Sequence, residues 1–331
     1  MKVTKAKIIG LGSYYPKKVL TNFDLEKMVE TSDEWIRTRT GVEERRIAAD
    51  DEFSSDMGTN AAKEALKDAN LNGSDIDFIL VATLTPDYIF PSTACLIQEN
   101  IKANNAAALD IQAACSGYVY ALTLAKSLVE AKTYKNVLIV ATEKLSSIVD
   151  YKDRSTAILF GDAATACVVS LDGKGLEIKS TFLAASGKEA DLLILPAGGS
   201  KLPASIQTVK EKKHYIQMKG KEVYKHAVRR MKEAIEICLK DANLTEKEIS
   251  WLIPHQANER IIDAIAKRFE HLESDKVFKE VVHKFGNTSA SSVGLALDIL
   301  KKENRIKPKE KILLTVFGAG FTWGACILEN N

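Results

Sequence analysis

The sequence contains few of the residues from which disulfide frameworks, metal knuckles and fibrous proteins are built. Only 5 cysteines, 7 prolines and 18 glycines occur among 331 residues. The cysteines stand far apart, at positions 95, 115, 167, 238 and 326, and no two form a CxxC pair. We therefore expect no disulfide framework and no zinc site, and we expect a reducing, cytoplasmic setting.

An excess of one charge and long apolar runs are also absent. Lysine and arginine number 46 and aspartate and glutamate 44, a net charge of +2, which argues against a nucleic-acid-binding protein. No apolar run approaches the roughly 18 residues of a membrane span, and the basic N-terminus lacks a signal-peptide cleavage site. The glycine patterns of dinucleotide-binding folds and ATPases are missing too. Neither nucleic acid nor membrane is an expected partner.

The residues that are present predict an α/β fold, because strand-like apolar runs alternate with helical patterns. The helical patterns span 54–70 and 118–132, and a stretch rich in Gly, Pro, Ser and Lys predicts a surface loop at 196–213. The first strand is expected at 6–11. Near-continuous apolar runs, typical of central strands buried on both faces, lie at 78–83, 106–111 and 137–142, and further strands are predicted at 251–254, 277–283 and 312–317.

An internal repeat indicates a gene duplication. The segment KDANLNGSDIDFILVA, from Lys67, is echoed by KDANLTEKEISWLIPH, from Lys240, at an offset of 173. The runs VLIV (137–140) and ILLT (312–315) follow at an offset of 175, and ACVV (166–169) and ACIL (325–328) at 159. Three matches in the same order predict two similar βα halves related by a pseudo-two-fold axis. We place these halves at residues 1–175 and 176–331.

Cys115 lies at a predicted strand-to-helix turn, in DIQAACSGYVYALTLAK. The N-terminus of a helix favours a thiolate, so we expect the pKa of this thiol below the usual ~8.5. A packed and inert core cysteine fits the position equally well. The other four cysteines lie within strand or helix patterns and are interpreted as structural.

Two polar residues of the second half follow predicted strands. His255 comes directly after WLIP, at the sheet edge where α/β ligands bind, although a hydrogen-bonded loop histidine is the alternative. Asn287, in FGNTSASS, precedes a helix, so it either caps that helix or presents its amide to a ligand. Near the C-terminus, FGAGFTWGA forms either an ordinary hairpin or a glycine-rich loop that aims backbone N–H groups into an oxyanion hole.

Together these segments resemble the thiolase superfamily, and within it the β-ketoacyl-acyl-carrier-protein synthase III family, whose members start type II fatty acid synthesis. The resemblance implies an α/β fold of duplicated βα halves, layered α-β-α-β-α. The matching segments span nearly the whole chain: SDEWIRTRTGVEERRI (32–47), FPSTACLIQ (90–98), DIQAACSGY (110–118), DRSTAILFGDAA (153–164), PHQANERI (254–261), FGNTSASS (285–292) and FGAGFTWGA (317–325).

The resemblance implies a decarboxylative Claisen condensation of an acyl-CoA primer, expected to be acetyl-CoA, with malonyl-acyl-carrier protein. The reaction would run through an acyl-Cys115 intermediate, with His255 and Asn287 completing the catalytic triad and no metal or bound cofactor. The backbone N–H groups of Cys115 and Ala319 would form the oxyanion hole. Ala319 stands where the family commonly has a glycine, and alanine can serve there if its φ is negative.

The resemblance also implies binding residues and an assembly. Trp35, Arg39 and Arg154 would grip the adenine and phosphate end of CoA, and Asn258 would contact its pantetheine arm. Arg260 would bind the acidic carrier protein, with Lys267 and Arg268 as helpers. A homodimer is expected, in which the segment around Phe90 reaches the partner's acyl pocket. The sequence adds that 88–91 is an apolar run outside any helical or strand pattern, which something must cover.

Two other functions fit the same triad. A type III polyketide synthase or a hydroxymethylglutaryl-CoA synthase would use it with a different acceptor. A degenerate subunit that only pairs with an active partner is a non-enzymatic alternative, but such a subunit is expected to lack the nucleophile.

Overall fold

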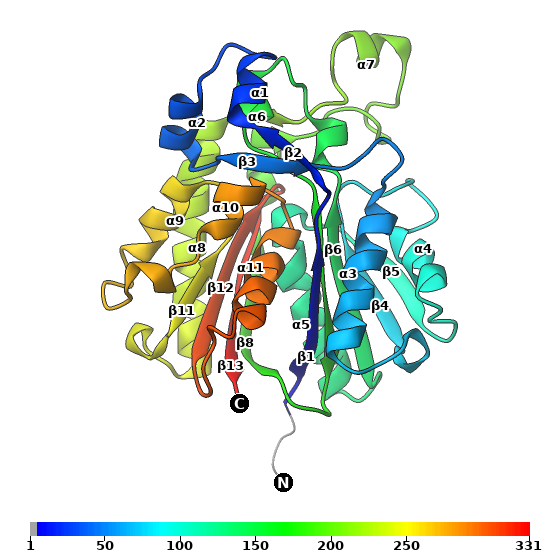
Figure 1. Cartoon of the computed structure of the whole chain (residues 1–331), viewed down its shortest axis with the longest axis vertical. Helices are drawn as coiled ribbons and strands as arrows, with labels where there is room; N and C mark the ends of the chain where they lie inside the picture. Colours follow the sequence, from blue (N-terminus) through cyan, green and yellow to red (C-terminus); the bar gives the residue numbers. More distant parts are fainter. Residues whose placement is uncertain (1–4) are drawn as a thin grey trace.

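The computed structural model describes residues 5–331. Residues 1–4, which belong to the basic N-terminus expected not to be a signal peptide, lie outside the described residues. A sheet of nine strands runs through the molecule in the order β11-β12-β13-β8-β1-β7-β6-β4-β5 (Figure 1). Its strands are β1 (Lys7–Tyr14), β4 (Phe78–Ala82), β5 (Ala107–Ile111), β6 (Asn136–Glu143), β7 (Ala163–Ser170), β8 (Leu176–Ala185), β11 (Trp251–Pro254), β12 (Lys311–Gly318) and β13 (Thr322–Asn330). Two small two-stranded sheets pair β2 (Lys18–Thr21) with β3 (Glu44–Ile47) and β9 (Leu193–Ile194) with β10 (Gln217–Met218).

The helices complete a layered arrangement. They are α1 (Asn22–Glu26), α2 (Asp33–Thr40), α3 (Ser54–Asp68), α4 (Thr93–Asn100), α5 (Gly117–Glu130), α6 (Arg154–Ala157), α7 (Ile206–Lys210), α8 (Gly220–Ala242), α9 (Glu259–Ala266), α10 (Glu280–Phe285) and α11 (Ser291–Lys302). Helix α3 covers the outer face of β1, β7 and β6, and α8 covers the outer face of β8, β13 and β12. Helices α5 and α11 contact strands of both halves and lie between them. The expected α-β-α-β-α layering is therefore confirmed.

Among residues 5–331, no helix has the combination of length and apolar composition that crossing a membrane requires.

The duplication appears in the register of the sheet. In the first half, Phe78 of β4 pairs with Val137 of β6, which pairs with Val169 of β7. In the second half, Trp251 of β11 pairs with Ile312 of β12, which pairs with Leu328 of β13. The paired positions are thus related by the offsets 173, 175 and 159 that the sequence repeat has. In each half the first of these strand pairs is parallel and the second is antiparallel. The predicted duplication is therefore confirmed.

The repeated KDAN sequence has the same local structure in both halves. Asn70 follows α3 with φ +53°, and Asn243 follows α8 with φ +54°. Asparagine tolerates this left-handed conformation better than most residues, so it ends each helix. A short 3₁₀ turn then leads into β4 in one half and β11 in the other.

One predicted strand is wrong. Of the segment 277–283, only Val277 makes a strand contact, an isolated bridge to Leu252, and the chain then enters α10. The reason is visible in the spacing of its buried apolar residues, Phe278, Val281, Val282 and Phe285. Their separations of three and four residues have the helical period rather than the alternation of a strand.

Two further expectations need correction. The run 106–111 forms β5, but β5 is the edge strand of the sheet and is half-exposed, not a central strand buried on both faces. The alanine-rich run 106–111 resembles a buried strand in composition. Whether a strand lies at the centre or the edge of the sheet depends on the strand order, which composition does not show. The expected loop at 196–213 includes a helical turn, α7, whose N-cap Ser205 accepts a hydrogen bond from the Thr208 N–H.

Helix α3 packs unusually close to β1. A Cβ atom at Gly12 would lie 2.3 Å from the backbone nitrogen of Ala65 and 2.5 Å from the carbonyl oxygen of Ala61. The backbone of α3 thus occupies the space that any side chain at this position would need. The contact fixes the outer helix layer on the first half of the sheet.

We predict that Gly12→Ala lowers the free energy of unfolding by about 1–3 kcal/mol, because α3 must move away from β1 to make room. Gly187→Ala is the matched control, since no atom lies within 4 Å of a Cβ there. Urea denaturation of the two variants and the wild type measures the difference. Equal midpoints for Gly12→Ala and the wild type would contradict the close packing of α3.

Candidate active site

A cavity of about 1260 Å³ is lined by residues from both halves of the chain. Much of its wall is apolar, including Leu84, Leu193 and Met231, which suits a long ligand that is partly apolar. Eight residues singled out from the sequence line this cavity: Trp35, Arg39, Cys115, His255, Asn258, Arg260, Asn287 and Ala319.

Cys115 lies in a 3₁₀ turn, Ala114–Ser116, that leads directly into α5, as the strand-to-helix prediction requires. The hairpin between β12 and β13 packs against this turn. Thr322 donates its hydroxyl hydrogen to the Ala113 carbonyl at 2.8 Å. A Cβ atom at Gly318 would lie 2.8 Å from the backbone nitrogen of Cys115, so the absence of a side chain lets the hairpin approach the nucleophile.

The expected lowering of the Cys115 pKa is wrong. Burial raises the pKa of this thiol to about 12; the Ser289 hydroxyl opposes the rise and the Glu143 carboxyl adds to it. Burial disfavours the charged thiolate, which is the main cause of the rise. The thiol carries its proton at neutral pH, so nucleophilic attack requires a group that accepts this proton.

His255 continues from β11, and its backbone N–H donates to the Thr315 carbonyl at 2.8 Å. Its ring is buried, and burial lowers the pKa of His255 to about 3. Nδ1 lies 2.7 Å from the Ser292 hydroxyl, which also accepts the Gln256 N–H at 3.4 Å. Among the described residues, Nδ1 is the acceptor within reach of the Ser292 hydroxyl hydrogen, so we assign the Ser292 proton to Nδ1. The neutral ring then carries its hydrogen on Nε2, as a donor.

Asn287 is held through its backbone and its side-chain oxygen. Its N–H donates to the Leu159 carbonyl at 2.8 Å, and its carbonyl accepts the Gly161 N–H at 3.1 Å. Oδ1 accepts the Ser289 N–H at 2.9 Å. Asn287 is therefore not the N-cap of α11, which is Ala290. The bond to Oδ1 orients the carboxamide so that its NH₂ group is left for a ligand.

A buried arginine supports the segment that carries Asn287. Arg45 donates to the Ile158 carbonyl at 2.8 Å and to Asn22 Oδ1 at 2.9 Å. Ile158 precedes Leu159, whose carbonyl accepts the Asn287 N–H. Through this backbone contact, the position of Arg45 is linked to that of Asn287.

Ala319 follows β12 at the mouth of the hairpin loop. It is not among the residues with positive φ in the part of the chain that the structure describes. Alanine in place of the expected glycine therefore introduces no left-handed strain. This meets the condition under which its backbone N–H can serve an oxyanion hole.

Trp35 and two arginines form a cluster at one end of the cavity. Arg154 lies 4.9 Å and Arg39 6.0 Å from the centre of the Trp35 ring system. Trp35 and Arg39 come from α2, and Arg154 from α6. An aromatic surface flanked by two cations suits a ligand with a planar base and phosphate groups. Arg154 contacts Trp35 but does not itself line the cavity.

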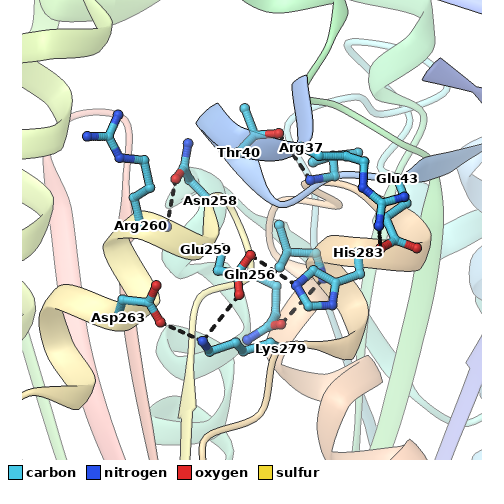
Figure 2. Close-up of polar contacts among 12 residues, drawn as sticks. Arg37, Thr40, Glu43, Gln256, Asn258, Glu259, Arg260, Asp263, Lys279 and His283 are labelled. Carbon is cyan, nitrogen blue, oxygen red and sulfur yellow. Dashed lines mark hydrogen bonds and ion pairs between the residues drawn. The ribbon is translucent and has the colours of Figure 1, made fainter. Parts of the chain in front are cut away.

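Asn258 links α9 to α2. Its Oδ1 accepts the Arg260 N–H at 2.9 Å and caps α9 (Figure 2). Its amide donates to the Arg39 carbonyl at 3.1 Å. The capping residue thus fixes the helix that carries Arg260 against the helix that carries Trp35.

The acidic side chains beside Arg260 contact other side chains, namely Lys279 and His283. Lys279 lies 3.2 Å from Glu259 and 2.5 Å from Asp263, and His283 lies 3.3 Å from Glu259. The side chain of Arg260 points away from this group (Figure 2). Its positive charge is therefore directed outward, beside the cavity that it lines.

Three other predicted residues do not reach this cavity. Arg268 is ion-paired with Glu236 and Glu246, and its role as a helper in binding the carrier protein stays a prediction. Lys267, at the C-cap of α9, lies outside the lining. Phe90 is 84% exposed and does not line the cavity of its own chain.

Comparison with known proteins agrees with this geometry. Models of the 3-oxoacyl-[acyl-carrier-protein] synthase III family match residues 109–187 and, for its C-terminal part, 239–330. The β-ketoacyl-[acyl-carrier-protein] synthase III of Chlamydia muridarum is 56% identical over 98% of this chain and 99% of its own length. The chain belongs to the β-ketoacyl-acyl-carrier-protein synthase III family.

Solved structures of the family have the same fold. The synthase III from Aquifex aeolicus is 48% identical, with a TM-score of 0.89 over 98% of this chain and 99% of that one. The Thermus thermophilus enzyme is 41% identical, also with a TM-score of 0.89, over 98% of both chains. The expected fold, family and acyltransferase class are confirmed, which decides against a type III polyketide or hydroxymethylglutaryl-CoA synthase. The roles of individual residues stay predictions.

Several polar residues that surround the triad were not expected from the sequence. Ser292 meets His255, and Ser289 and Glu143 lie near Cys115. An acid directly after the buried run 137–142 is an unusual feature that could have singled out Glu143. Which hydroxyl of the TSASS segment meets which partner depends on how α11 begins, and spacing alone does not determine it.

We predict that the ring of His255 stays neutral, with its proton on Nε2, from about pH 5 to 8. ¹⁵N NMR of the ring, assigned with His255→Gln, measures this. Because the folded pKa, about 3, lies below the usual 6.5, the unfolded state binds more protons between these values. His255 therefore lowers stability as pH falls through that window. A ring that titrates near its usual pKa would contradict the assignment.

Proposed function

We propose that this chain condenses an acyl-CoA primer with malonyl-acyl-carrier protein through a thioester on Cys115. The observation that carries the proposal is the convergence of three groups on one cavity. Cys115 precedes α5, His255 follows β11 and Asn287 precedes α11, yet all three line the same space. A thiol, a neutral imidazole and a carboxamide together supply a nucleophile and two hydrogen-bond donors.

In the first half-reaction, Sγ of Cys115 attacks the carbonyl carbon of the acyl-CoA, and CoA leaves as its thiol. One thioester replaces another, so the overall energy changes little. The oxygen becomes negatively charged in the transition state, and the backbone N–H groups of Cys115 and Ala319 would stabilise it. The close approach of Gly318 to Cys115 supports this role, because it brings the two backbone segments together.

In the second half-reaction, malonyl-acyl-carrier protein loses CO₂ and negative charge develops on its thioester oxygen. The Nε2–H of His255 and the amide of Asn287 would donate to this oxygen. A neutral imidazole is a much weaker acid than imidazolium, so it stabilises the enolate without protonating it. The enolate carbon then attacks the acyl group on Cys115, and the sulfur is released as the 3-oxoacyl-carrier protein forms.

The two substrates would enter from the surface that carries the Trp35 cluster and α9. Trp35, Arg39 and Arg154 would hold the adenine and phosphates of CoA, and Asn258 its pantetheine arm. Arg260 would attract the acidic carrier protein. Lys221 of α8 also lines this cavity and adds positive charge that the sequence did not single out, whereas Lys225, in the same lining, is ion-paired with Glu222.

The two halves would contribute different parts of this site. We place their boundary between residues 175 and 176, in the connection between β7 and β8. The first half then carries the nucleophile Cys115 and the CoA-binding residues Trp35 and Arg39. The second half carries His255, Asn287 and the carrier-protein surface.

A homodimer would cover two exposed apolar features. Tyr88, Ile89 and Phe90 are 61%, 87% and 84% exposed, and the edge strand β5 leaves Leu109 40% exposed. Exposure of adjacent large side chains is typical of an interface. In a dimer, Phe90 of the second copy would close the end of the acyl pocket. A short pocket favours acetyl-CoA as the primer.

All five cysteines are free in the described structure, which suits a reducing compartment such as the cytoplasm.

We predict that Cys115→Ser removes the mass increment that acetyl-CoA gives the wild-type protein. Asn287→Ala should still acquire this increment but condense about 10²–10³-fold more slowly, since it lacks one enolate donor. Intact-mass spectrometry measures the first half-reaction, and release of 3-oxoacyl-carrier protein measures the second. An increment that persists on another cysteine in Cys115→Ser, or condensation by Asn287→Ala at the wild-type rate, would overturn these roles.

We predict that Arg260→Glu weakens the use of malonyl-acyl-carrier protein and leaves acylation by acetyl-CoA unchanged. The defect should become smaller above ~0.15 M salt, where exposed charges are screened within about 8 Å. Lys63→Glu, on the outer helix α3, is the control for the same reversal of charge. If both half-reactions decline equally in Arg260→Glu, or if Lys63→Glu has the same effect, the docking role is wrong.

A further inference from the structure

The proton of Cys115 needs an acceptor, and His255 is poorly placed to be that acceptor. Burial lowers the pKa of His255 to about 3 and raises that of Cys115 to about 12. Transfer between them would create two charges in a buried site, and burial penalises each of them. Nδ1 of His255 is also engaged by Ser292 at 2.7 Å. A second buried titratable group lies close to the nucleophile.

Glu143, the last residue of β6, is fully buried beside Cys115. Its two carboxyl oxygens have different surroundings. Oε2 accepts the Leu84 N–H at 3.0 Å, the Thr85 hydroxyl at 2.9 Å and the Thr83 hydroxyl at 3.4 Å. Oε1 is buried and has no hydrogen-bond partner among residues 5–331. Three donors therefore hold negative charge on Oε2, and Oε1 is the oxygen that is free to take a proton.

Ser289 lies near both the acid and the thiol. Its hydroxyl lowers the pKa of Glu143 and that of Cys115. Its Oγ is fully buried and, within the described chain, makes no hydrogen bond of regular geometry, so the hydroxyl is not committed to another partner. Its backbone has φ +52° and donates its N–H to Asn287 Oδ1 at 2.9 Å. A hydroxyl can accept one proton while it releases another, so Ser289 can connect the two groups.

We propose that Glu143 accepts the proton of Cys115 during acylation, and that the Ser289 hydroxyl passes it on. The inference rests on the proposed function. The Sγ–H bond breaks, its proton moves to Oγ of Ser289, and the Ser289 proton moves to Oε1 of Glu143. Sγ then forms its bond to the acyl carbon. As the bond between that carbon and the CoA sulfur breaks, the proton returns by the same path to this sulfur. CoA leaves as its thiol and Glu143 is again a carboxylate.

This path keeps one negative charge in the site throughout, first on Glu143, then on the reacting sulfur and oxygen atoms. No separated pair of buried charges is formed, which is the physical advantage over transfer to His255. Glu143 is also the stronger base of the two, because burial raises its pKa to about 7. Glu143 acts through Ser289 and is therefore a positioning residue that holds a proton.

The other groups that face Glu143 are uncharged. The segment 83–85 presents two hydroxyls and one backbone N–H, and Ala163 pairs with Glu143 across β7. Lys144, the next residue, directs its ammonium to the carbonyls of Ala49 and Glu52 at 2.7 Å. Asp162 accepts hydrogen bonds from Ser146 and Ala48. Cys115 is thus the titratable group to which the carboxyl is coupled.

The experiment is the pH dependence of single-turnover acylation by acetyl-CoA, followed by rapid quench and intact mass from about pH 5 to 9. The wild-type rate is expected to rise with pH through an inflection near the pKa of Glu143, about 7. Glu143→Gln should acylate at least ~10²-fold more slowly and lose this inflection. Ser289→Ala should do the same, and the double variant should be no slower than the slower single one.

A second pair of variants tests the protonation of Glu143 without removing it. Thr85→Val deletes a donor to Oε2, destabilises the carboxylate and should move the inflection upward by roughly one pH unit. Thr85→Ser retains the hydroxyl and should return the inflection toward its wild-type position. A merely structural role for Glu143 would change the rate at every pH and leave the inflection where it is.

The outcomes separate this inference from the proposed function. Acylation by Glu143→Gln or Ser289→Ala with the wild-type rate and profile would overturn the proton path. If Glu143→Gln does not fold, an inflection that is the same in Thr85→Val and the wild type overturns it. If the wild-type chain is acylated by no acyl-CoA, the proposed function fails instead.

Discussion

Exclusion of water from the nucleophile is the constraint on which the rest of the site depends. Cys115, His255 and Glu143 are all buried, and burial opposes the charged form of each. A buried site can hold a charge only where hydrogen-bond donors surround it. Oε2 of Glu143, with its three donors, meets that condition. The chemistry that fits this environment moves one negative charge between positions that hydrogen-bond donors surround, and it does not create a separated pair of opposite charges.

The duplicated fold produces this burial. Helices α5 and α11 lie between the strands of the two halves, and each begins at the same cavity. Cys115 precedes α5, while Asn287 and Ser289 precede α11. Because the starts of two central helices face one another, their polar turns meet in the interior instead of at the surface. The hairpin of Gly318 closes against the first of these turns, which a side chain at that position would prevent.

The sequence predicts the features that local patterns control. The repeat predicted the duplication, and the sheet register reproduces its offsets at Phe78 and Trp251. Cys115 lies at the turn before a helix that its context predicts. The position of β5 at the edge of the sheet depends on strand order, which spacing does not reveal. The pKa of Cys115 was predicted in the wrong direction, because a sequence shows the start of a helix but not the depth at which it is buried.

The same limit applies to surface charge. Arg260 and Arg268 stand on or just after one helix, and the family resemblance makes Arg260 the expected carrier-protein contact and Arg268 its helper. In the folded chain Arg268 is ion-paired with two glutamates, whereas the acids beside Arg260 are bound by Lys279. An exposed cation attracts a partner only through charge that its neighbours have not already neutralised. The arrangement of acids around α9, more than the number of basic residues, therefore determines where an acidic protein can dock.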